Sequence, residues 1–540
     1  MGNFEKEDLI YILDLKTQGK SLREISNIMG CGKSTVGDFL QKITYKDFWD
    51  NLSEDDKPVA YGELKEPEHK RLSGEARKFV ISCVQNNTHV HQDFLDTLKV
   101  YAKENNAEIL FSTFTYNKNG FQNSVKSDSN IWYDPQVREF ICNDSLRLAD
   151  DLIFCGELNI LPTAVRPLSG FNNYTGLSSA IVPHVKVQLE SVPTPKHEPV
   201  KMLYTTGTVT QRNYIEKKSG QIASWHHVYG ALVVEIDEHG NWFVRQLIAD
   251  SETGSFYDLN KLYTKDGVFN EDNILAINYG DVHVAKLDQD VADLSWRSED
   301  SIKSTLKPMF QFVHDVFDHQ SRNHHNTNNP HIQFMLYHNG VDSVDEEIKE
   351  TTEELYRMSS RDSKLIIVDS NHDRALERWL READYRKDPT NAMVFLKLQL
   401  AKYESMMNHD EDFHVFGYAI KEKQKELDLK DMDIKFLGLD ESFRLLDIEF
   451  GQHGDMGNNG ARGSVRAFDM QGIKHNIGHS HSTSIFNGVY VAGVSGKLEM
   501  GYNSGGSSWS HSHILTYLNG KRTILTLKKC RVTGRMRWRA

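Results

Sequence analysis

Five short blocks of polar residues in the second half of the chain offer ligands for divalent metal ions. In chain order they are Asp281-x-His283, Asp315-x-x-Asp318, Asn371-His372-Asp373, His453 and His479-x-His481. Hard or borderline divalent cations prefer carboxylate oxygens, amide oxygens and neutral imidazole nitrogens, and no block contains a thiolate. Two such ions about 3.5–4 Å apart can hold a phosphodiester, lower the pKa of a bound water and stabilise the leaving oxygen. The blocks therefore predict a metal site.

The central block must be positioned by a strand and a helix. The apolar run 365–368 precedes Ser370-Asn371-His372-Asp373, and a strongly helical stretch, 374–380, follows it. A buried strand that ends in this way presents its polar residues at the C-terminal edge of a sheet, where open α/β folds bind ligands. Taken alone, such a block is more often a helix cap or a turn. Five blocks in order make that alternative remote.

The order of the blocks resembles that of the calcineurin-like metallophosphoesterase family, whose phosphatases and recombination-repair nucleases carry the same five. The resemblance covers about residues 274 to 515 and implies two packed sheets flanked by helices, an α/β (α+β) fold that the alternation of strands and helices also favours. Two departures are visible: His314 and Ser370 stand where the family usually has glycine. Both leave the ligand-type residues in place, but they could alter the shape of the local loops.

The resemblance also implies a role for each residue of the blocks. The implied ligands are Asp281, His283 and His481 for one metal ion, Asn371, His453 and His479 for the other, and Asp315 for both. His372 matches the histidine that faces the scissile phosphate, as an acid or a charge stabiliser. Asp373 and Asp318 would orient it and its neighbours. Manganese is the first choice of metal, with magnesium as the alternative.

The sequence of residues 1–48 predicts a small helical unit. Helices are expected at 5–16, 22–29 and 33–43, with Ser21 and Glu24 forming a capping box at the second. Three short helices with a glycine turn before the last resemble a helix-turn-helix unit. The residues facing DNA would then be Lys33, Ser34, Thr35 and Asp38. The alternative is a three-helix cap for protein interaction or oligomerisation.

The rest of the chain is expected to divide into a polar linker (49–75), an α/β domain of unknown role (76–270) and the metallophosphoesterase domain (271–518). The middle domain begins with a βαβ pattern: a strand at 79–84, a helix at 92–104 and a strand at 108–111. Its later strands are expected at 152–155, 231–236 and 242–248, the last two joined by a hairpin turn. In the metallophosphoesterase domain, helices are expected at 344–358 and 374–385, and strands at 445–452, 472–477 and 485–492. A charged, mostly helical insertion is expected at 398–430, with a break near 416–417.

A basic C-terminal strip, 519–540, follows a strand that ends at 518. Strands 512–518 and 521–527 predict a hairpin across Asn519-Gly520, and the strip contains eight Lys or Arg residues and no Asp or Glu. Its candidate DNA-binding residues are Lys528, Lys529, Arg531, Arg535 and Arg537, which lie close to Trp538. Two alternatives are a basic tail that packs on the acidic body and a contact between subunits.

Composition limits the classes of protein. The 540 residues, 39% hydrophobic and 26% charged, are typical of a soluble globular protein of about three domains. No apolar run of membrane-spanning length and no signal-peptide pattern is present, so no membrane partner is expected. Five scattered cysteines without a C-x-x-C pair indicate a reducing, cytoplasmic location. The net charge of −13 argues against indiscriminate nucleic-acid binding.

Three functions are compatible with these features. The first is a two-metal DNA nuclease. The second is a metal-dependent phosphatase or small-molecule phosphodiesterase whose terminal units serve assembly. The third is a DNA-binding regulatory protein with a degenerate catalytic core. Every ligand position is filled, which disfavours the third, and two separate candidate DNA-contacting elements favour the first. The stretch 368–391 is also similar to the early DNase and metallophosphoesterase proteins of T5-like tailed phages. That similarity implies degradation of host DNA in the host cytoplasm by a homo-oligomer.

Overall fold

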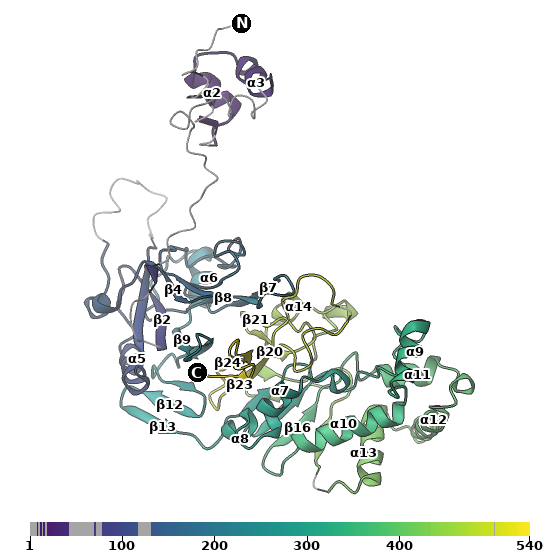
Figure 1. Cartoon of the computed structure of the whole chain (residues 1–540). Coiled ribbons are helices and arrows are strands. Elements are labelled where there is room, and N and C mark those ends of the chain that lie inside the picture. Colours follow the sequence, from purple (N-terminus) through teal and green to yellow (C-terminus); the bar gives the residue numbers. More distant parts are fainter. Residues whose placement is uncertain are drawn as a thin grey trace. The chain divides into compact units, whose positions relative to one another are not determined.

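The computed structural model describes residues 19–42, 70–71, 78–116, 131–430, 432–501 and 503–540, together with Asp8, Tyr11, Ile12, Leu15 and Lys16. It divides into two compact units, residues 1–68 and residues 69–540 (Figure 1). Most of the predicted linker 49–75 and most of the first predicted helix, 5–16, lie outside the described residues.

The N-terminal unit contains helices α2 (Leu22–Ile28) and α3 (Lys33–Lys42). The capping box predicted at α2 is confirmed: Glu24 N donates to Ser21 Oγ at 3.3 Å, and Ser21 N donates to the Glu24 carboxylate at 2.8 Å. Gly30 has a φ of 63°, which glycine adopts without steric cost in the turn between the helices. A small core holds the unit together; its members are Ile12, Leu15, Ile25 and Val36.

A four-stranded sheet with order β10-β9-β2-β3 opens the larger unit. Its elements are β2 (Lys78–Gln85), α5 (Gln92–Asn105), β3 (Glu108–Phe114), β9 (Gly230–Ile236) and β10 (Trp242–Ile248). The parallel pair β2–β3 around α5 confirms the predicted βαβ pattern, and the antiparallel pair β9–β10 confirms the predicted hairpin. The Asp237 carboxylate closes the hairpin turn by accepting from the backbone N–H groups of His239 and Asn241, both at 2.9 Å.

An eleven-stranded sheet joins the parts of the chain that the sequence divides at residue 270. Its order is β1-β4-β5-β6-β8-β7-β21-β22-β20-β19-β18. In chain order the strands are β1 (Lys70–Arg71), β4 (Ser145–Ala149), β5 (Leu152–Cys155), β6 (Ser179–Val182), β7 (Leu189–Val192), β8 (Lys201–Thr205), β18 (Arg444–Leu445), β19 (Ile448–Glu449), β20 (Lys474–Ile477), β21 (Ser484–Phe486) and β22 (Val489–Val491). The junction is the antiparallel pair β7–β21, in which Ser484 lies opposite Glu190. Residues 76–270 and 271–518 therefore share one sheet within one compact unit.

Two predicted strands of this sheet are interrupted. The segment 485–492 forms a hairpin of β21 and β22 because Asn487, with a φ of 52°, turns the chain. The segment 445–452 contains only the short antiparallel pair β18–β19, in which Leu446 has a φ of 56°. A left-handed backbone at a residue other than glycine ends regular strand geometry, and apolar content alone does not reveal it.

A six-stranded sheet, order β17-β16-β15-β14-β23-β24, carries the polar blocks. Its strands are β14 (Ala276–Asn278), β15 (Phe310–Val313), β16 (Lys364–Ile367), β17 (Ile434–Phe436), β23 (Ser512–Thr516) and β24 (Arg522–Thr526). The first four run parallel, and β23–β24 form the predicted hairpin. Side chains alternate between its faces, so Leu365 and Ile367 join the core beneath the helices, while Ile366 and Val368 face the core shared with β19.

Helices cover one face of this sheet (Figure 1). They are α10 (Val344–Met358), α11 (Ala375–Glu382), α12 (Ala392–Met407) and α13 (Val415–Glu426). The charged insertion is helical as predicted, but its break lies at 408–414 rather than near 416–417. His414 caps α13 by accepting from Gly417 N at 3.0 Å, which places Phe416 and Gly417 inside the first turn.

The remaining elements are short. They are η2 (Pro135–Phe140), α6 (Lys218–His226), β11 (Phe256–Asp258), β12 (Lys261–Thr264), β13 (Gly267–Asn270), η3 (Val284–Lys286), α7 (Gln289–Ala292), η4 (Asp293–Arg297), α8 (Ile302–Leu306), α9 (Pro330–His338), η5 (Tyr385–Lys387), η6 (Asn458–Gly460), α14 (Val465–Asp469), β25 (Lys528–Lys529) and β26 (Met536–Arg537). In the described part of the chain, no helix is long and apolar enough to span a membrane. All five cysteines are free thiols.

Arg245 in β10 provides a test of the packing. It is 1% exposed; its guanidinium donates to Asp258 at 2.7 and 2.8 Å and to Glu235 at 2.8 Å. Because Arg245→Met leaves the buried Asp258 carboxylate without a cation and leaves Glu235 with Lys78 alone, we expect it to lower the free energy of unfolding by about 3–5 kcal/mol, measured by urea denaturation. The control, Arg381→Met, removes an exposed ion pair to Glu382 and should change it by less than about 1 kcal/mol. Equal stability of the two variants would contradict this account.

Candidate metal centre

The five polar blocks meet where the two large sheets present the C-terminal ends of their strands. Asp281 and His283 follow β14, Asp315 and Asp318 follow β15, and the block 371–373 follows β16. These strands are parallel, so their ends lie at one edge. The eleven-stranded sheet adds His453 after β19 and the block 479–481 after β20, which are also parallel.

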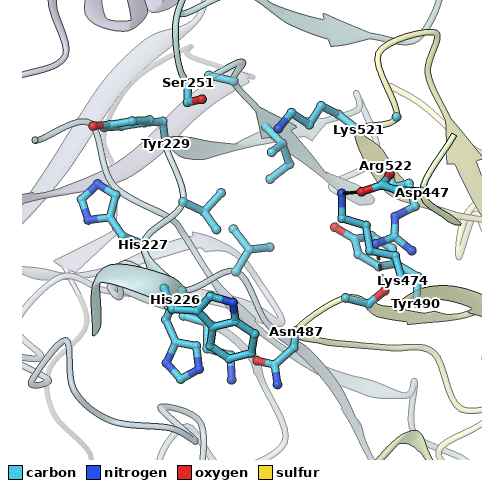
Figure 2. A pocket seen from close by; sticks show the side chains of 18 of the residues that line it. His226, His227, Tyr229, Ser251, Asp447, Lys474, Asn487, Tyr490, Lys521 and Arg522 are labelled. Carbon is cyan, nitrogen blue, oxygen red and sulfur yellow. Dashed lines mark hydrogen bonds and ion pairs between the residues drawn. The ribbon is translucent and has the colours of Figure 1, made fainter. Parts of the chain in front are cut away.

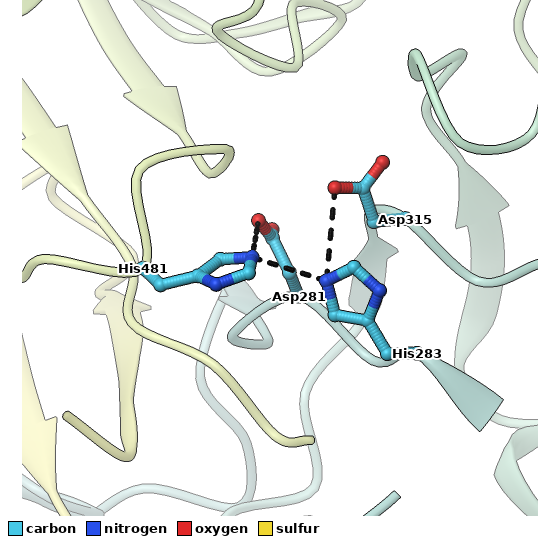
Figure 3. Close-up of side chains that lie close together, drawn as sticks. All are labelled: Asp281, His283, Asp315 and His481. Carbon is cyan, nitrogen blue, oxygen red and sulfur yellow. Dashed lines mark hydrogen bonds and ion pairs between the residues drawn. The ribbon is translucent and has the colours of Figure 1, made fainter. Parts of the chain in front are cut away.

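The first group of converging side chains is Asp281, His283, Asp315 and His481 (Figure 3). His481 Nε2 lies 3.2 Å from Asp281 Oδ2 and 3.0 Å from His283 Nε2. His283 Nε2 lies 3.8 Å from Asp315 Oδ2. All four residues are buried, and one potential ligand atom from each lies within 4.8 Å of the others. This arrangement could hold a divalent cation.

The second group shares Asp315 with the first and adds His453 and His479. His453 Nε2 lies 3.2 Å from Asp315 Oδ2, the same oxygen that faces His283 Nε2. The Asp315 carboxylate therefore lies between the two groups, where the resemblance places a bridging ligand. The two groups contain six of the seven predicted ligands; the seventh, Asn371, directly precedes His372, whose backbone N–H donates to Asp315 Oδ1 at 3.4 Å.

Several buried polar atoms of the site have no hydrogen-bond partner within the described part of the chain. Among them are Asp281 Oδ1 and Asn371 Oδ1. Leaving a buried polar atom unsatisfied costs about 1–3 kcal/mol. Ligation to a cation would satisfy these two oxygen atoms, which belong to residue types that bind divalent ions. The donors present thus fit a metal ion.

Asp318 and Asp373, predicted to orient the neighbours of the site, contact residues of the blocks. His283 Nδ1 lies 2.7 Å from Asp318 Oδ1, and this contact leaves Nε2 directed at the ligand group. His372 Nδ1 lies 3.4 Å from the same oxygen. Asp373 accepts from Phe317 N at 2.8 Å and from Ser370 Oγ at 2.9 Å, so the serine that replaces the family's glycine helps to hold Asp373.

Burial and charge act on the titrating groups in opposite directions. Burial lowers the pKa of His372, but Asp315 and Asp318 outweigh it and raise that pKa to about 9. Burial also raises the pKa of Asp373 to about 7, and the charge of Asp315 adds to the rise. Burial would raise the pKa of Asp318, yet His283 and His372 bring it below the ordinary range. The site therefore holds a dense set of mutually dependent charges.

The backbone at the ligands is strained. His283, Asp315, His479 and His481 have φ values of 49°, 44°, 69° and 56°. Left-handed conformations cost residues other than glycine about 1–3 kcal/mol each and cluster at functional sites. The surrounding structure must therefore fix these four residues in place.

Sequence reasoning missed four contributors. Arg374 donates to both Asp369 and Asp455 and so ties the third block to the fourth. His314, noted only as a departure from the family pattern, is buried with Nδ1 3.4 Å from His453 Nδ1. The other two are Glu347, which accepts from Ser321 after the second block, and Trp509, whose ring centroid lies 4.3 Å from that of His481. Of these four, only Arg374 could have been found from the local sequence, because it directly follows the Asn-His-Asp block.

The predicted DNA-contacting residues lie in two places. In the N-terminal unit, Lys33 and Ser34 are exposed at the start of α3 and Thr35 is half-buried, while the side chain of Asp38 lies outside the described part. In the basic strip, four of the five cations contact the body: Lys528 lies over Trp242 at 2.8 Å from the ring centroid, Lys529 pairs with Asp290, Arg531 with Asp151 and Arg537 with Asp237. Arg535 is exposed. These contacts agree with the packing alternative, and DNA binding by the strip stays a prediction.

Gly478 offers a test of the site that substitutes none of the candidate ligand residues. A Cβ at this position would lie 2.1 Å from Asp281 Oδ1. We expect Gly478→Ala to displace the Asp281 carboxylate and to weaken Mn²⁺ binding at least about tenfold, about 1.4 kcal/mol, measured by isothermal titration calorimetry. Gly438→Ala is the control, because the nearest atom to its added Cβ is 3.9 Å away. Unchanged Mn²⁺ affinity in the Gly478 variant would exclude Asp281 as a ligand.

Comparison with known proteins identifies a relative from a phage. No family model matches the chain. No solved structure matches it either. Protein A1 of Escherichia phage T5 is 42% identical over 486 residues, which cover 88% of this chain and 86% of that protein. This likeness extends over nearly the whole length of both proteins, so the chain belongs to the family of phage T5 Protein A1.

Proposed function

We propose that the protein is a metal-dependent DNA nuclease with a calcineurin-like metallophosphoesterase core. The observation that carries the proposal is the Asp315 carboxylate, one oxygen of which faces His283 Nε2 on one side and His453 Nε2 on the other. A shared carboxylate between two ligand groups is what a two-metal centre for phosphodiester hydrolysis requires. The family relationship to a phage protein is consistent with action in the host cytoplasm.

The two ligand groups would each hold one ion. Asp281, His283, Asp315 and His481 form the first, and Asp315, His453 and His479 form the second, to which the resemblance adds Asn371. Divalent ions bound there supply a water of lowered pKa and neutralise the charge of the phosphate. Oxygen and imidazole donors without a thiolate suit Mn²⁺, or Mg²⁺ as the alternative.

His372 is placed to act on the substrate. Its side chain is 24% exposed, whereas those of His283 and His453 are fully buried. Asp318 lies beside Nδ1 and fixes the orientation of the ring. His372 can therefore donate a hydrogen bond to a phosphate oxygen, or a proton to the leaving oxygen.

DNA is the proposed substrate because the N-terminal unit offers an element to bind it. Lys33 and Ser34 are exposed at the start of α3, which follows a glycine turn as in helix-turn-helix units. Assembly as a homo-oligomer stays a prediction.

A metal-dependent phosphatase or small-molecule phosphodiesterase is the second candidate. It is favoured by the packing of Lys528, Arg531 and Arg537 on the body, which leaves fewer cations free for a DNA backbone. Substrate size separates the two candidates, because the chemistry at the metal centre would be the same.

The proposal predicts metal-dependent cleavage of DNA. Metal-stripped protein would be given Mn²⁺, Mg²⁺ or Zn²⁺ and tested on linear duplex DNA, circular DNA and a small chromogenic phosphodiester. We expect DNA cleavage with Mn²⁺ that Asp281→Ala abolishes, because this carboxylate is a ligand of the first group. Hydrolysis of the small ester alone would contradict the nuclease and establish the second candidate.

The role of His372 predicts a separation of turnover from metal binding. We expect His372→Ala to lower kcat by about 10²–10⁴-fold, as for loss of a general acid, while Mn²⁺ binding measured by calorimetry is retained. His338→Ala serves as the control, since His338 is an exposed histidine at the end of α9. Near-full activity of the His372 variant would show that the site is assigned wrongly.

A further inference from the structure

A second polar cavity, of about 560 Å³, lies in the larger unit away from the metal centre. Cavities of roughly 300–1,000 Å³ are typical of small-molecule sites. Tyr229, His226 and His227 lie on one wall, and Lys521, Arg522 and Lys474 lie on the opposite wall (Figure 2). Lys474 begins β20, and the other end of this strand leads to His479. None of the predicted metal ligands lines the cavity.

Cations outnumber carboxylates around this cavity. Its lining includes Lys186, Arg212, Lys474, Lys521 and Arg522, against Asp447 and Asp469. Asp447 is paired with Lys474 at 2.5 Å, and Asp469 accepts from Asn487 Nδ2 at 2.9 Å. The surplus positive charge faces the interior of the cavity without a matching carboxylate.

Arg522 shows this surplus most clearly. It is 5% exposed and donates to the carbonyl oxygens of His475 and Gly488 and to Asn476 Oδ1, at 2.8–2.9 Å. Its guanidinium also lies 4.1 Å from the ring centroid of Tyr490. Among the described residues it has no carboxylate partner, and burial lowers its pKa to about 10. A buried cation without a counter-ion is costly, and an anionic ligand would reduce that cost.

Two lysines that line the cavity also have no carboxylate within ion-pair distance among the described residues. Lys186 is 2% exposed; its Nζ donates to Val165 O at 2.7 Å and lies 4.5 Å from the ring centroid of Phe486. Lys521 is partly buried, and its pKa is lowered by burial and by the neighbouring Lys474. Neither forms an ion pair with any residue that the structure describes. Arg522 and Lys521 thus line the cavity without an ion-pair partner among the described residues, whereas the Lys186 ammonium is directed at Val165 and Phe486, which do not line it.

Neutral polar atoms at the cavity also lack partners. His226 is 5% exposed, and its Nδ1 has no hydrogen-bond partner in the described ranges. Burial lowers the pKa of His226 to about 4, so the ring is neutral near pH 7. Asn487 Oδ1 is likewise buried and unpartnered. The cavity therefore offers hydrogen bonds to a ligand in addition to positive charge.

An exposed aromatic residue lies at the same cavity. Trp225, near the end of α6, is 69% exposed and lines the cavity. Tyr229 contributes a second ring, over which the Arg212 guanidinium lies at 5.6 Å from the centroid. Aromatic faces beside cations are the combination on which nucleic-acid bases stack while their phosphates are neutralised.

We propose that this cavity binds a nucleoside phosphate, with the phosphate at Lys521 and Arg522 and the base against Trp225. The ligand is a free nucleotide or the phosphorylated end of a DNA strand, which share this chemistry. The site is separate from the metal centre and does not depend on the proposed nuclease activity.

The test is binding to the full chain in EDTA, so that metal-dependent binding at the other site is absent. Deoxyadenosine monophosphate, inorganic phosphate and short oligonucleotides with and without a 5′-phosphate would be titrated by calorimetry. We expect the nucleotide to bind and Lys521→Gln to weaken its binding at least about tenfold. Trp225→Leu should weaken binding of the nucleotide but not of inorganic phosphate, because only the nucleotide has a base to stack.

Two controls and two outcomes complete the test. Lys421→Gln and Trp132→Leu change an exposed lysine on α13 and an exposed tryptophan outside the cavity, and both should bind as the unaltered protein does. Binding of the mononucleotide alone identifies a free nucleotide, and binding of oligonucleotides that requires the 5′-phosphate identifies a strand end. No binding of any probe at millimolar concentration, or equal affinity in folded Lys521 and Trp225 variants, would overturn the proposal.

Discussion

The Asp315 carboxylate is the group on which the candidate metal centre depends. It is 1% exposed and lies between His283 Nε2 at 3.8 Å and His453 Nε2 at 3.2 Å. Burial would raise its pKa, but the surrounding histidines, His453 first, hold it well below the ordinary range. The charge of Asp315 in turn raises the pKa of His453 to about 9, against the effect of burial. Because the two ligand groups share this carboxylate, loss of Asp315 would remove a candidate ligand from both of them.

The contact between the two large sheets makes this convergence possible. Asp281, Asp315 and His372 come from the six-stranded sheet, whereas His453 and His479 come from the eleven-stranded sheet. The sheets meet through a buried apolar cluster in which the rings of Phe312 and Phe450 stack at 4.4 Å between centroids. Phe312 belongs to β15 and Phe450 follows β19, so the core that joins the sheets lies directly behind the strand ends that carry the ligands. Interiors packed at crystal-like density resist small shifts, and strained ligands such as His481 need such a support.

The blocks that converge at the candidate site were predicted from their order along the chain, which resembles that of the metallophosphoesterase family, because each block alone is more often a helix cap or a turn. The helices, hairpins and capping box could be predicted because their signals are local: apolar periodicity, turn residues and the spacing of Ser21 and Glu24. The pairing of β7 with β21 and the salt bridge from Arg374 to Asp455 could not be predicted, since their partners are far apart in the chain and carry no local mark. Trp242 beneath Lys528 is a contact of the same kind. The break of the insertion was placed wrongly because a histidine cap at His414 looks like any other polar residue in a charged run.

The pairing of β7 with β21 also changes how residues 76–270 are understood. Through this pair they extend the sheet whose β20 leads to His479 and His481, so residues 76–270 help to support these two candidate metal ligands. They also supply Trp225, His226 and Lys186 to the second cavity, while β20 supplies Lys474. Strand β20, which is four residues or about 13 Å long, therefore has a cationic cavity at its start and candidate metal ligands after its end. A ligand that neutralises the buried charge of Arg522 would stabilise the start of the strand that leads to His479, because Arg522 donates to His475 O in that strand.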